Sequence, residues 1–202
     1  MPVTINGNGS ITGLSVGGLG SGVVNTATLA DGAASGSKLT MPSGSVIQTV
    51  QSIKTTTQSY STGSSTLSDS YFDISGLSVS ITPSSGTKCF VSYTVNVGGQ
   101  AGYGQGLALF RDSTQIYLAD ASGNIQGLSN FDYTVDNKKV DSMAGQFLDT
   151  HGANGSTAVT YKLQMYVATP GWTSRVNRSQ TTSSDRYYGP VSYTHLTLPT
   201  KA

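Results

Sequence analysis

Apolar and polar side chains alternate along several segments of the chain, and this two-residue period limits the possible folds more than any other feature. Residues 87–97 carry an apolar side chain at every second position: Cys89, Val91, Tyr93, Val95 and Val97. Residues 158–168 repeat the pattern: Val159, Tyr161, Leu163, Met165 and Val167. A helix would space its apolar residues three or four apart, so both segments are predicted to be β-strands with one covered and one solvated face.

Shorter segments add to this count of strands. Further strands are predicted at residues 45–52, 76–82, 106–111 and 115–119, and the polar tract 55–70 resembles a hairpin. Turn residues separate them, notably Pro-Ser-Ser-Gly at 83–86 and Asp112, Ser113 and Thr114. Strands with one covered face are typical of two antiparallel sheets stacked face to face. The fold class is therefore predicted to be all-β, with an antiparallel jelly-roll-type β-sandwich over residues 44–190.

The composition favours the same fold class. Only 10% of the residues are charged, and all ten acidic residues are Asp, with no Glu. Glu, Lys, Ala and Leu form the surfaces of helices, whereas Thr, Val and Tyr suit sheets. Ser and Thr together make up roughly a quarter of the chain, which suits strands and turns.

Charge and hydropathy argue against several functional classes. The formal net charge is +1, so no basic field would attract nucleic acid or an anionic membrane. We find no run of 18 apolar residues and, in the first residues, neither the basic nor the apolar region of a signal peptide. Membrane insertion and export are therefore not expected. Cys89 is single, so it is predicted to be a small buried side chain rather than a disulfide partner or a nucleophile.

Residues 1–43 differ from the rest of the chain. They are rich in Gly, Ser, Ala and Thr, and their apolar residues are too few to build a core alone. Two interpretations remain open: a disordered linker, or a fibrous segment that folds only when identical chains wrap together. Either way, residues 1–43 are predicted to be an extended attachment or trimerisation segment.

The last dozen residues carry a different signal. Val191 to Thr200 are the translation of GTC TCT TAT ACA CAT CTG ACG CTG CCG ACG, a base string that matches the transposase mosaic end and adapter used in sequencing libraries. We therefore expect residues 191–202 to be adapter read-through that replaces the natural C-terminus, although a terminal strand is the alternative. On this interpretation His195 and Lys201 have no function. Any synonymous departure from that base string in the gene would refute it.

Several short blocks resemble a known family. Residues 25–39, NTATLADGAASGSKL, resemble the LADGA…KL units of bacteriophage tail fibres and related virion proteins. Residues 44–52, 76–88, 107–114, 147–164 and 176–179 resemble, in the same order, the C-terminal domain of tail-fibre-like proteins from uncultured marine phages. The resemblance implies a head domain that trimerises, broadly like those of complement C1q and tumour necrosis factor. The chain has a single LADGA unit, so any shaft would be very short.

Candidate catalytic groups are few. His151, the one histidine outside the adapter-like tail, follows two residues after Asp149, so a base with an orienting carboxylate can be imagined. Gly, Asn and Ser surround it, which favours a solvated loop. Most Asp residues lie in turn-type contexts rather than in a carboxylate pair suited to glycoside hydrolysis. We therefore predict a non-catalytic protein without a cofactor.

A metal site is likewise not predicted. Asp132, Asp136 and Asp141 are close together in sequence and have the oxygen ligands that calcium prefers. Their spacing matches no calcium-binding loop, and Lys138 and Lys139 lie between them. The three residues are therefore predicted to be solvated turn residues.

The segment around the single tryptophan is the predicted ligand site. Trp172 follows Pro170 and Gly171, with Arg175 and Arg178 nearby, and an indole beside guanidinium groups could stack on a sugar ring and donate to its hydroxyls. The alternative is that Trp172 caps the core or a subunit contact. Two weaker candidates are Tyr187 and Tyr188. By contrast, three aromatic residues within predicted strands are expected to pack in the core or at a trimer axis: Tyr93, Tyr161 and Phe110.

These inferences lead to one functional prediction with two alternatives. The resemblance implies a tail-fibre or virion decoration protein in the virion, a homotrimer that contacts other tail proteins and adheres to a host-surface glycan without catalysis. The first alternative is a stand-alone carbohydrate-binding module, and the second is a phage polysaccharide depolymerase.

Overall fold

The computed structural model describes residues 4–5, 11–12, 42, 44–62, 71–118, 127–181 and 192–199. The chain divides into two compact units, Met1–Pro42 and Ser43–Ala202. In the first unit, β1 (Thr4–Ile5) and β2 (Ile11–Thr12) form an antiparallel hairpin. The rest of the predicted attachment segment, apart from Pro42, lies outside the described residues.

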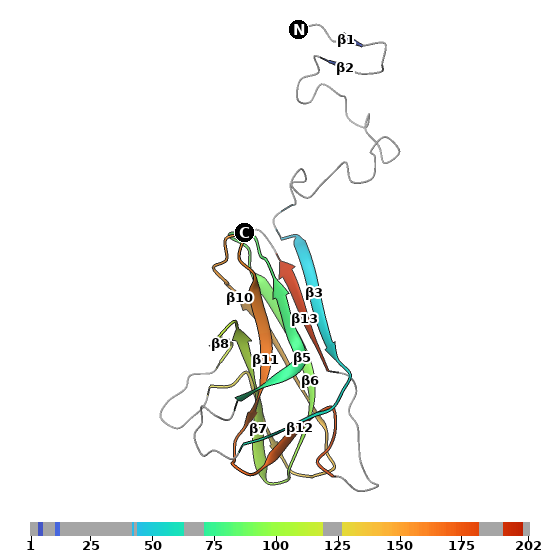
Figure 1. The fold of residues 1–202 in the computed structure, drawn as a ribbon, viewed down its shortest axis with the longest axis vertical. Helices are drawn as coiled ribbons and strands as arrows, with labels where there is room; N and C mark the ends of the chain where they lie inside the picture. Colours follow the sequence, from blue (N-terminus) through green and yellow to red (C-terminus); the bar gives the residue numbers. More distant parts are fainter. Residues whose placement is uncertain are drawn as a thin grey trace. The chain divides into compact units, whose positions relative to one another are not determined.

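The second unit contains a five-stranded antiparallel sheet. Its order is β5 (Tyr71–Ile81), β11 (Val159–Val167) and β7 (Tyr103–Arg111). Two short strands, β8 (Thr114–Ile116) and β9 (Asn130–Thr134), follow one another along the other edge of β7. Figure 1 labels β5, β7, β8 and β11, and it shows β5, β11 and β7 running along the long axis of the unit.

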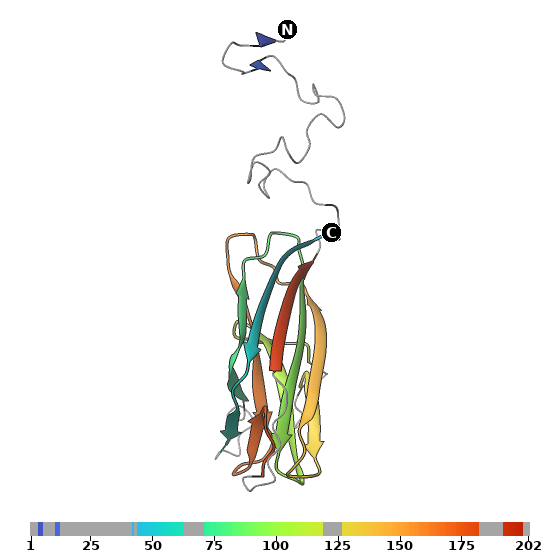
Figure 2. The same ribbon diagram turned by 90° about the vertical axis from the view of Figure 1, so that its right-hand side faces the viewer.

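A six-stranded antiparallel sheet forms the second layer. It runs from β3 (Val46–Lys54) through β13 (Ser192–Pro199) to β6 (Cys89–Gly99). β12 (Thr173–Val176) pairs with the end of β6 beyond β13, and β4 (Gln58–Ser61) pairs with β12. β10 (Asp141–Asp149) pairs with the opposite edge of β6. Figure 2 shows the two layers with their strands along the same axis.

The strand order confirms the predicted fold class. Strands β5, β6 and β7 alternate between the two sheets, and the neighbours β3-β13-β6-β10 and β5-β11-β7-β8 give the winding of a jelly-roll sandwich. The described residues contain no helix, and thus no helix that could cross a membrane. Residues 192–199 occupy the slot between β3 and β6. Because this ladder consists of backbone hydrogen bonds, any extended segment can fill that slot, so the pairing does not distinguish a natural last strand from a substituted one.

The core lies between the two sheets, where the alternating residues predicted from the sequence meet. All five alternating apolar residues of β6 are at most 1% exposed, as are Tyr161, Leu163 and Met165 of β11. Leu107 and Leu109 of β7 and Leu77 of β5 are likewise fully buried. Cys89, as predicted, is buried in this core, and burial raises the pKa of its thiol. The two-residue period therefore identified the inward faces of the central strands.

Three strands of the second unit are not predicted by the sequence pattern. Asp132 is predicted to be a turn residue, yet it lies within the strand β9. β10 was missed because Gly145 interrupts its apolar alternation, and β12 was missed because it has only four residues, one of them Arg175. Pairing with β6 and β7 stabilises these edge segments, which lack a strong pattern of their own.

Candidate functional site

Trp172 lies in the short connection between β11 and β12. Its ring stacks on that of Tyr103, the first residue of β7, with 3.7 Å between ring centroids and 21° between ring planes. Gly171 N–H donates to Thr62 O at 2.6 Å, which fixes the connection against β4. Both rings are half-buried, so the pair closes this end of the sandwich and still contacts solvent.

The register of the strands places this aromatic pair relative to the point where the chain enters the sandwich. β12 pairs with Val97–Gly99, at the last residues of β6. β3 begins at Val46, which pairs with Pro199 of β13, and β13 in turn reaches Phe90 at the start of β6. The chain therefore enters the sandwich at one end, and Trp172 lies at the opposite end. Figure 1 shows β3 beginning at the upper end and β12 at the lower end.

The two arginines that follow Trp172 lie on a different surface. Along β12, Ser174 and Val176 are buried, so Arg175 projects from the opposite, outer face of the six-stranded sheet. Its Nε donates to Gln180 Oε1 and its Nη1 to Ser59 Oγ, both at 2.6 Å. Burial and the neighbouring positive charge of Arg178 lower the pKa of Arg175. The strand period thus places Arg175 on the side of β12 that faces away from the core.

Arg178 belongs to a segment that crosses the outer face of the same sheet. This segment begins at Asn177, which has a φ of 61° and is 3% exposed. Its side-chain amide donates to Lys54 O at 2.9 Å and to Thr56 O at 3.2 Å. The Arg178 Nη2 atom is buried and has no hydrogen-bond partner among the described residues. Tyr187 and Tyr188, the weaker candidates, lie outside the described residues.

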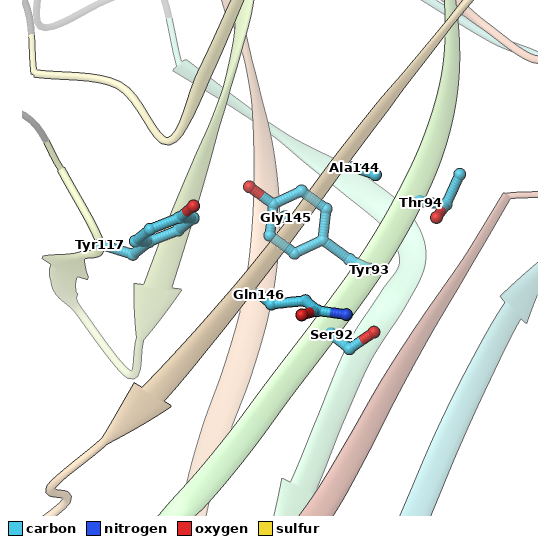
Figure 3. Close-up of a pocket in the computed structure, with 7 residues that line it drawn as sticks. All are labelled: Ser92, Tyr93, Thr94, Tyr117, Ala144, Gly145 and Gln146. Atoms are coloured by element: carbon cyan, nitrogen blue, oxygen red, sulfur yellow. The ribbon is translucent and has the colours of Figure 1, made fainter.

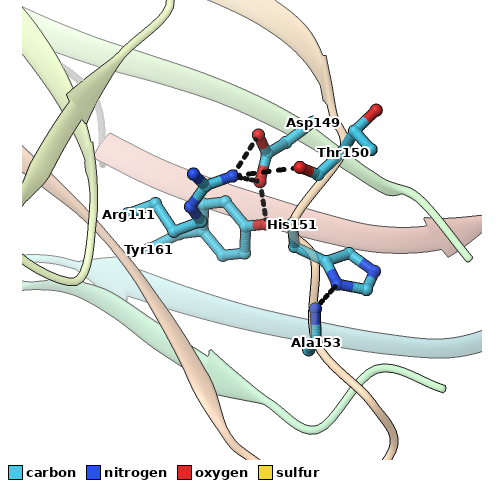
Figure 4. Close-up of polar contacts among 6 residues, drawn as sticks. All are labelled: Arg111, Asp149, Thr150, His151, Ala153 and Tyr161. Atoms are coloured by element: carbon cyan, nitrogen blue, oxygen red, sulfur yellow. Dashed lines mark hydrogen bonds and ion pairs between the residues drawn. The ribbon is translucent and has the colours of Figure 1, made fainter. Parts of the chain in front are cut away.

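Asp149 does not contact His151. Its carboxylate instead accepts two hydrogen bonds from Arg111 Nη1, at 2.8 and 2.9 Å, and one from Tyr161 Oη at 2.6 Å (Figure 4). The Asp149 side chain is 6% exposed. Burial, and then the hydrogen bond to Asp149, raise the pKa of Tyr161. Asp149 is therefore the centre of a buried ion pair at the end of β10.

His151 is bound to its own loop. Its Nδ1 accepts the N–H of Ala153 at 2.9 Å (Figure 4), and its Nε2 lies 3.3 Å from Thr87 Oγ1. Nδ1 must be unprotonated to accept, so the neutral ring carries its proton on Nε2, facing Thr87. Shallow hollows of about 240 and 200 Å³ lie on the two sides of this loop. The imagined arrangement of His151 oriented by Asp149 is not formed.

The three acidic residues considered for calcium are spread over two strands and a turn. Asp132 is in β9, and Asp141 begins β10, where it pairs with Lys139 Nζ at 2.8 Å. Asp136 lies between these strands and accepts the N–H of Lys138 at 2.9 Å. Within the described ranges, no group of three possible metal-binding side chains is found.

Of the three aromatic residues expected in the core or at a trimer axis, two are buried in the core. Tyr93 and Tyr161 are 1% and 0% exposed. Phe110 instead lies half-buried on the outer face of the five-stranded sheet, where its ring packs 6.1 Å from Tyr71 and Lys162 Nζ lies 5.9 Å from its centroid. Since Phe110 alternates with the inward-facing Leu109, the period itself places it on this outer face.

A further hollow formed by the described residues lies beside the middle of β6 and β10. Its volume is about 470 Å³, and seven residues line it (Figure 3): Ser92, Tyr93, Thr94, Tyr117, Ala144, Gly145 and Gln146. Figure 3 shows Tyr117 on one side and Thr94 on the other, with Tyr93 between them. Apart from Tyr93, sequence reasoning singled out none of these residues. The one local signal was Gly145 inside a strand, since such a glycine often marks a close approach.

Comparison with known proteins does not assign the chain to a family. No protein-family model matches the chain. A search of curated proteins likewise finds no match.

Proposed function

We propose that the chain is a non-catalytic adhesive head of a phage tail fibre or virion decoration protein, which binds a host-surface glycan as a trimer. The observation that carries this proposal is the position of the Tyr103–Trp172 pair, at the end of the sandwich opposite the start of β3. A head held through the segment before β3 would present these rings outward. The resemblance to tail-fibre proteins supplies the proposed virion location, the tail-protein partners and the trimer.

The stacked pair suits weak binding to a sugar. A half-buried indole offers a flat apolar face that can contact the C–H groups of a sugar ring. The Tyr103 ring holds the indole in one orientation, so little side-chain entropy would be lost on binding. Weak sites on several copies of the head would hold a surface through avidity.

Adhesion to host cells or their purified polysaccharide tests the glycan part of the proposal. Trp172→Ala should weaken binding on the order of tenfold or more, because tryptophans at binding surfaces are frequent hot spots. Trp172→Phe, which keeps an aromatic face on Tyr103, is the matched control and should retain most of the binding. Unchanged binding by a folded Trp172→Ala variant would contradict the proposed contact.

Light scattering tests the assembly, with an expected mass of three times the 20.9 kDa chain. A stable monomer would favour the stand-alone binding module over the fibre head. Release of oligosaccharides from the host polysaccharide would overturn the non-catalytic proposal and favour a depolymerase.

A further inference from the structure

A second surface carries an inference that does not depend on Trp172. The hollow between Tyr117 and Thr94 lies at the middle of β6 and β10, away from the β12 end of the sandwich. Its volume of about 470 Å³ falls in the range of small-molecule sites. Strands form most of its wall, so its shape is set by the sandwich rather than by loops.

Tyr117 is held in an unusual backbone conformation at the edge of this hollow. Its φ is 51°, in the left-handed region that bulky residues rarely adopt. Ser129 Oγ fixes this conformation, because it donates to Tyr117 O at 2.8 Å while accepting the N–H of Leu109 at 3.0 Å. The Tyr117 ring stacks on Phe147 at 5.2 Å and 27°. Backbone strain of this kind lowers the stability of the fold. Residues that carry it are concentrated at ligand-binding and active sites, where the strain serves the function.

Tyr93 and Gly145 form the floor of the hollow. Tyr93 hydrogen-bonds to Asn130 Oδ1, and Asn130 Nδ2 donates to Ala144 O at 3.0 Å, which ties the ring to β9 and β10. A Cβ atom at Gly145 would overlap the Tyr93 ring, so the glycine allows the ring to lie against β10. Both rings are therefore fixed by the fold: Tyr93, at 1% exposed, supports the hollow from beneath, and the half-buried Tyr117 ring is the one that a ligand can contact.

The polar groups of the lining are all uncharged. They comprise the hydroxyls of Ser92, Thr94 and Tyr117 and the amide of Gln146. The side chains of Ser92 and Thr94 are half-buried and that of Gln146 is exposed, so a ligand in the hollow can reach them. Hydroxyl and amide groups beside fixed aromatic rings suit a molecule that has hydroxyls on its rim and C–H groups on its face.

We propose that the hollow formed by Tyr93, Tyr117, Thr94 and Gln146 is a binding site for an uncharged saccharide. An acidic sugar would lack a cation in the lining to pair with its carboxylate or sulfate, and burying such a charge unpaired is costly. The site differs from the Tyr103–Trp172 pair in position and in residues, so either site can exist without the other.

The test uses the full chain and immobilised oligosaccharides of neutral hexoses, N-acetylhexosamines and deoxyhexoses, with uronate and sulfated oligosaccharides for comparison. Gln146→Ala and Thr94→Val should each weaken binding of a neutral saccharide about three- to tenfold, as expected for one lost hydrogen bond. Ala144→Phe, which adds a ring to the hollow, should abolish it. The matched controls are Gln48→Ala, an exposed glutamine on β3, and Leu148→Phe, an exposed position on β10 outside the lining, and both should bind normally.

The possible outcomes separate this site from the proposed adhesive end. Loss of neutral-saccharide binding in the hollow variants but not in Trp172→Ala supports the inference. Loss only in Trp172→Ala overturns it and leaves the adhesive function standing. Binding restricted to acidic oligosaccharides, or no saccharide binding at millimolar concentrations, also overturns it.

Discussion

Asn177 directs the chain after β12 through its backbone and its side chain together. Its N–H donates to Asn96 O at 2.8 Å, and its amide group satisfies two carbonyls at the end of β3 and just beyond it. Asparagine adopts a positive φ more readily than most residues, and its short amide can reach local backbone groups. One side chain thus joins the start of the crossing segment to a strand far away in the sequence.

Two substitutions separate these contributions. Asn177→Gly keeps the positive φ but leaves Lys54 O and Thr56 O without their donor, so it should lower the free energy of unfolding by about 1–3 kcal/mol. Asn177→Ala should be less stable still, because its Cβ disfavours the left-handed conformation. Urea unfolding would measure both. Equal stability of Asn177→Ala and the unchanged protein would contradict the role of this residue.

The ion pair of Asp149 and Arg111 is a second residue-level determinant. Asp149→Asn removes the charge from a side chain that is 6% exposed, leaves Arg111 without its counterion, and should cost on the order of 3 kcal/mol. The matched control is Asp141→Asn, which breaks a pair of the same 2.8 Å length whose side chains are 45% and 27% exposed. Because water screens that exposed pair, Asp141→Asn should leave the unfolding temperature nearly unchanged. A similar loss of stability in both variants would contradict the argument that burial makes the Asp149 ion pair the more important one.

At the scale of elements, the segment 177–181 packs across the outer face of the six-stranded sheet. Gln180 N–H and Thr181 N–H donate to Asn137 O at 3.0 and 3.1 Å, which ties the segment to the turn between β9 and β10. It passes directly over Gly98 of β6, where a Cβ would overlap the carbonyl oxygen of Arg178. Position 98 of β6 must therefore have no side chain.

Gly98→Ala should consequently destabilise the sandwich by about 1–3 kcal/mol, because backbone must shift to make room. Gly104→Ala is the matched control: its Cβ would meet the tip of the Phe131 ring, which is 59% exposed and free to turn away. Thermal unfolding should show a clear loss for the first variant and a small one for the second. The reverse order would contradict the crossing as described.

The elements divide by how far the sequence could predict them. β6 and β11 alternate without interruption and face a full core, so their inward residues follow from the period alone. β9, β10 and β12 form because they make backbone hydrogen bonds with neighbouring strands. The residues of those strands lie elsewhere in the chain, so the local pattern does not predict the pairing. The hollow could not be predicted for the same reason, since the register of β6 with β10 brings Tyr93 to Gly145, and Tyr117 comes from the residue after β8. For Trp172 the sequence indicated the strand end but not the stacking on Tyr103.

For the whole molecule, buried tyrosines determine the response to alkali. Burial raises the pKa of Tyr60, Tyr93 and Tyr161 above the value near 10 of an unfolded chain. The stability that these phenols contribute is complete below pH 10 and falls above it, because the unfolded state releases their protons first. Each phenol lowers the free energy of unfolding by up to about 1.4 kcal/mol per pH unit there. Lys54 opposes this weakly, since burial lowers its pKa.

Absorbance of phenolate near 295 nm, followed together with circular dichroism, would check this expectation. The buried tyrosines should ionise only as the β-sheet signal disappears. Tyr161→Phe should reduce by one the number of protons that the protein releases when it unfolds in alkali. Full phenolate absorbance with an intact sheet signal would show that these side chains are open to solvent.

The place of β13 between β3 and β6 has a consequence for synthesis. β3 leaves the ribosome first among the strands of the sandwich, and residues 192–199, which pair with it, leave last. Until residues 192–199 have been synthesised, the nascent chain exposes an unmatched strand edge that neighbouring nascent chains on the same messenger could join. Completion of the sandwich therefore waits for the strand made last, and ribosome spacing or a holding chaperone would influence the yield of correctly folded protein.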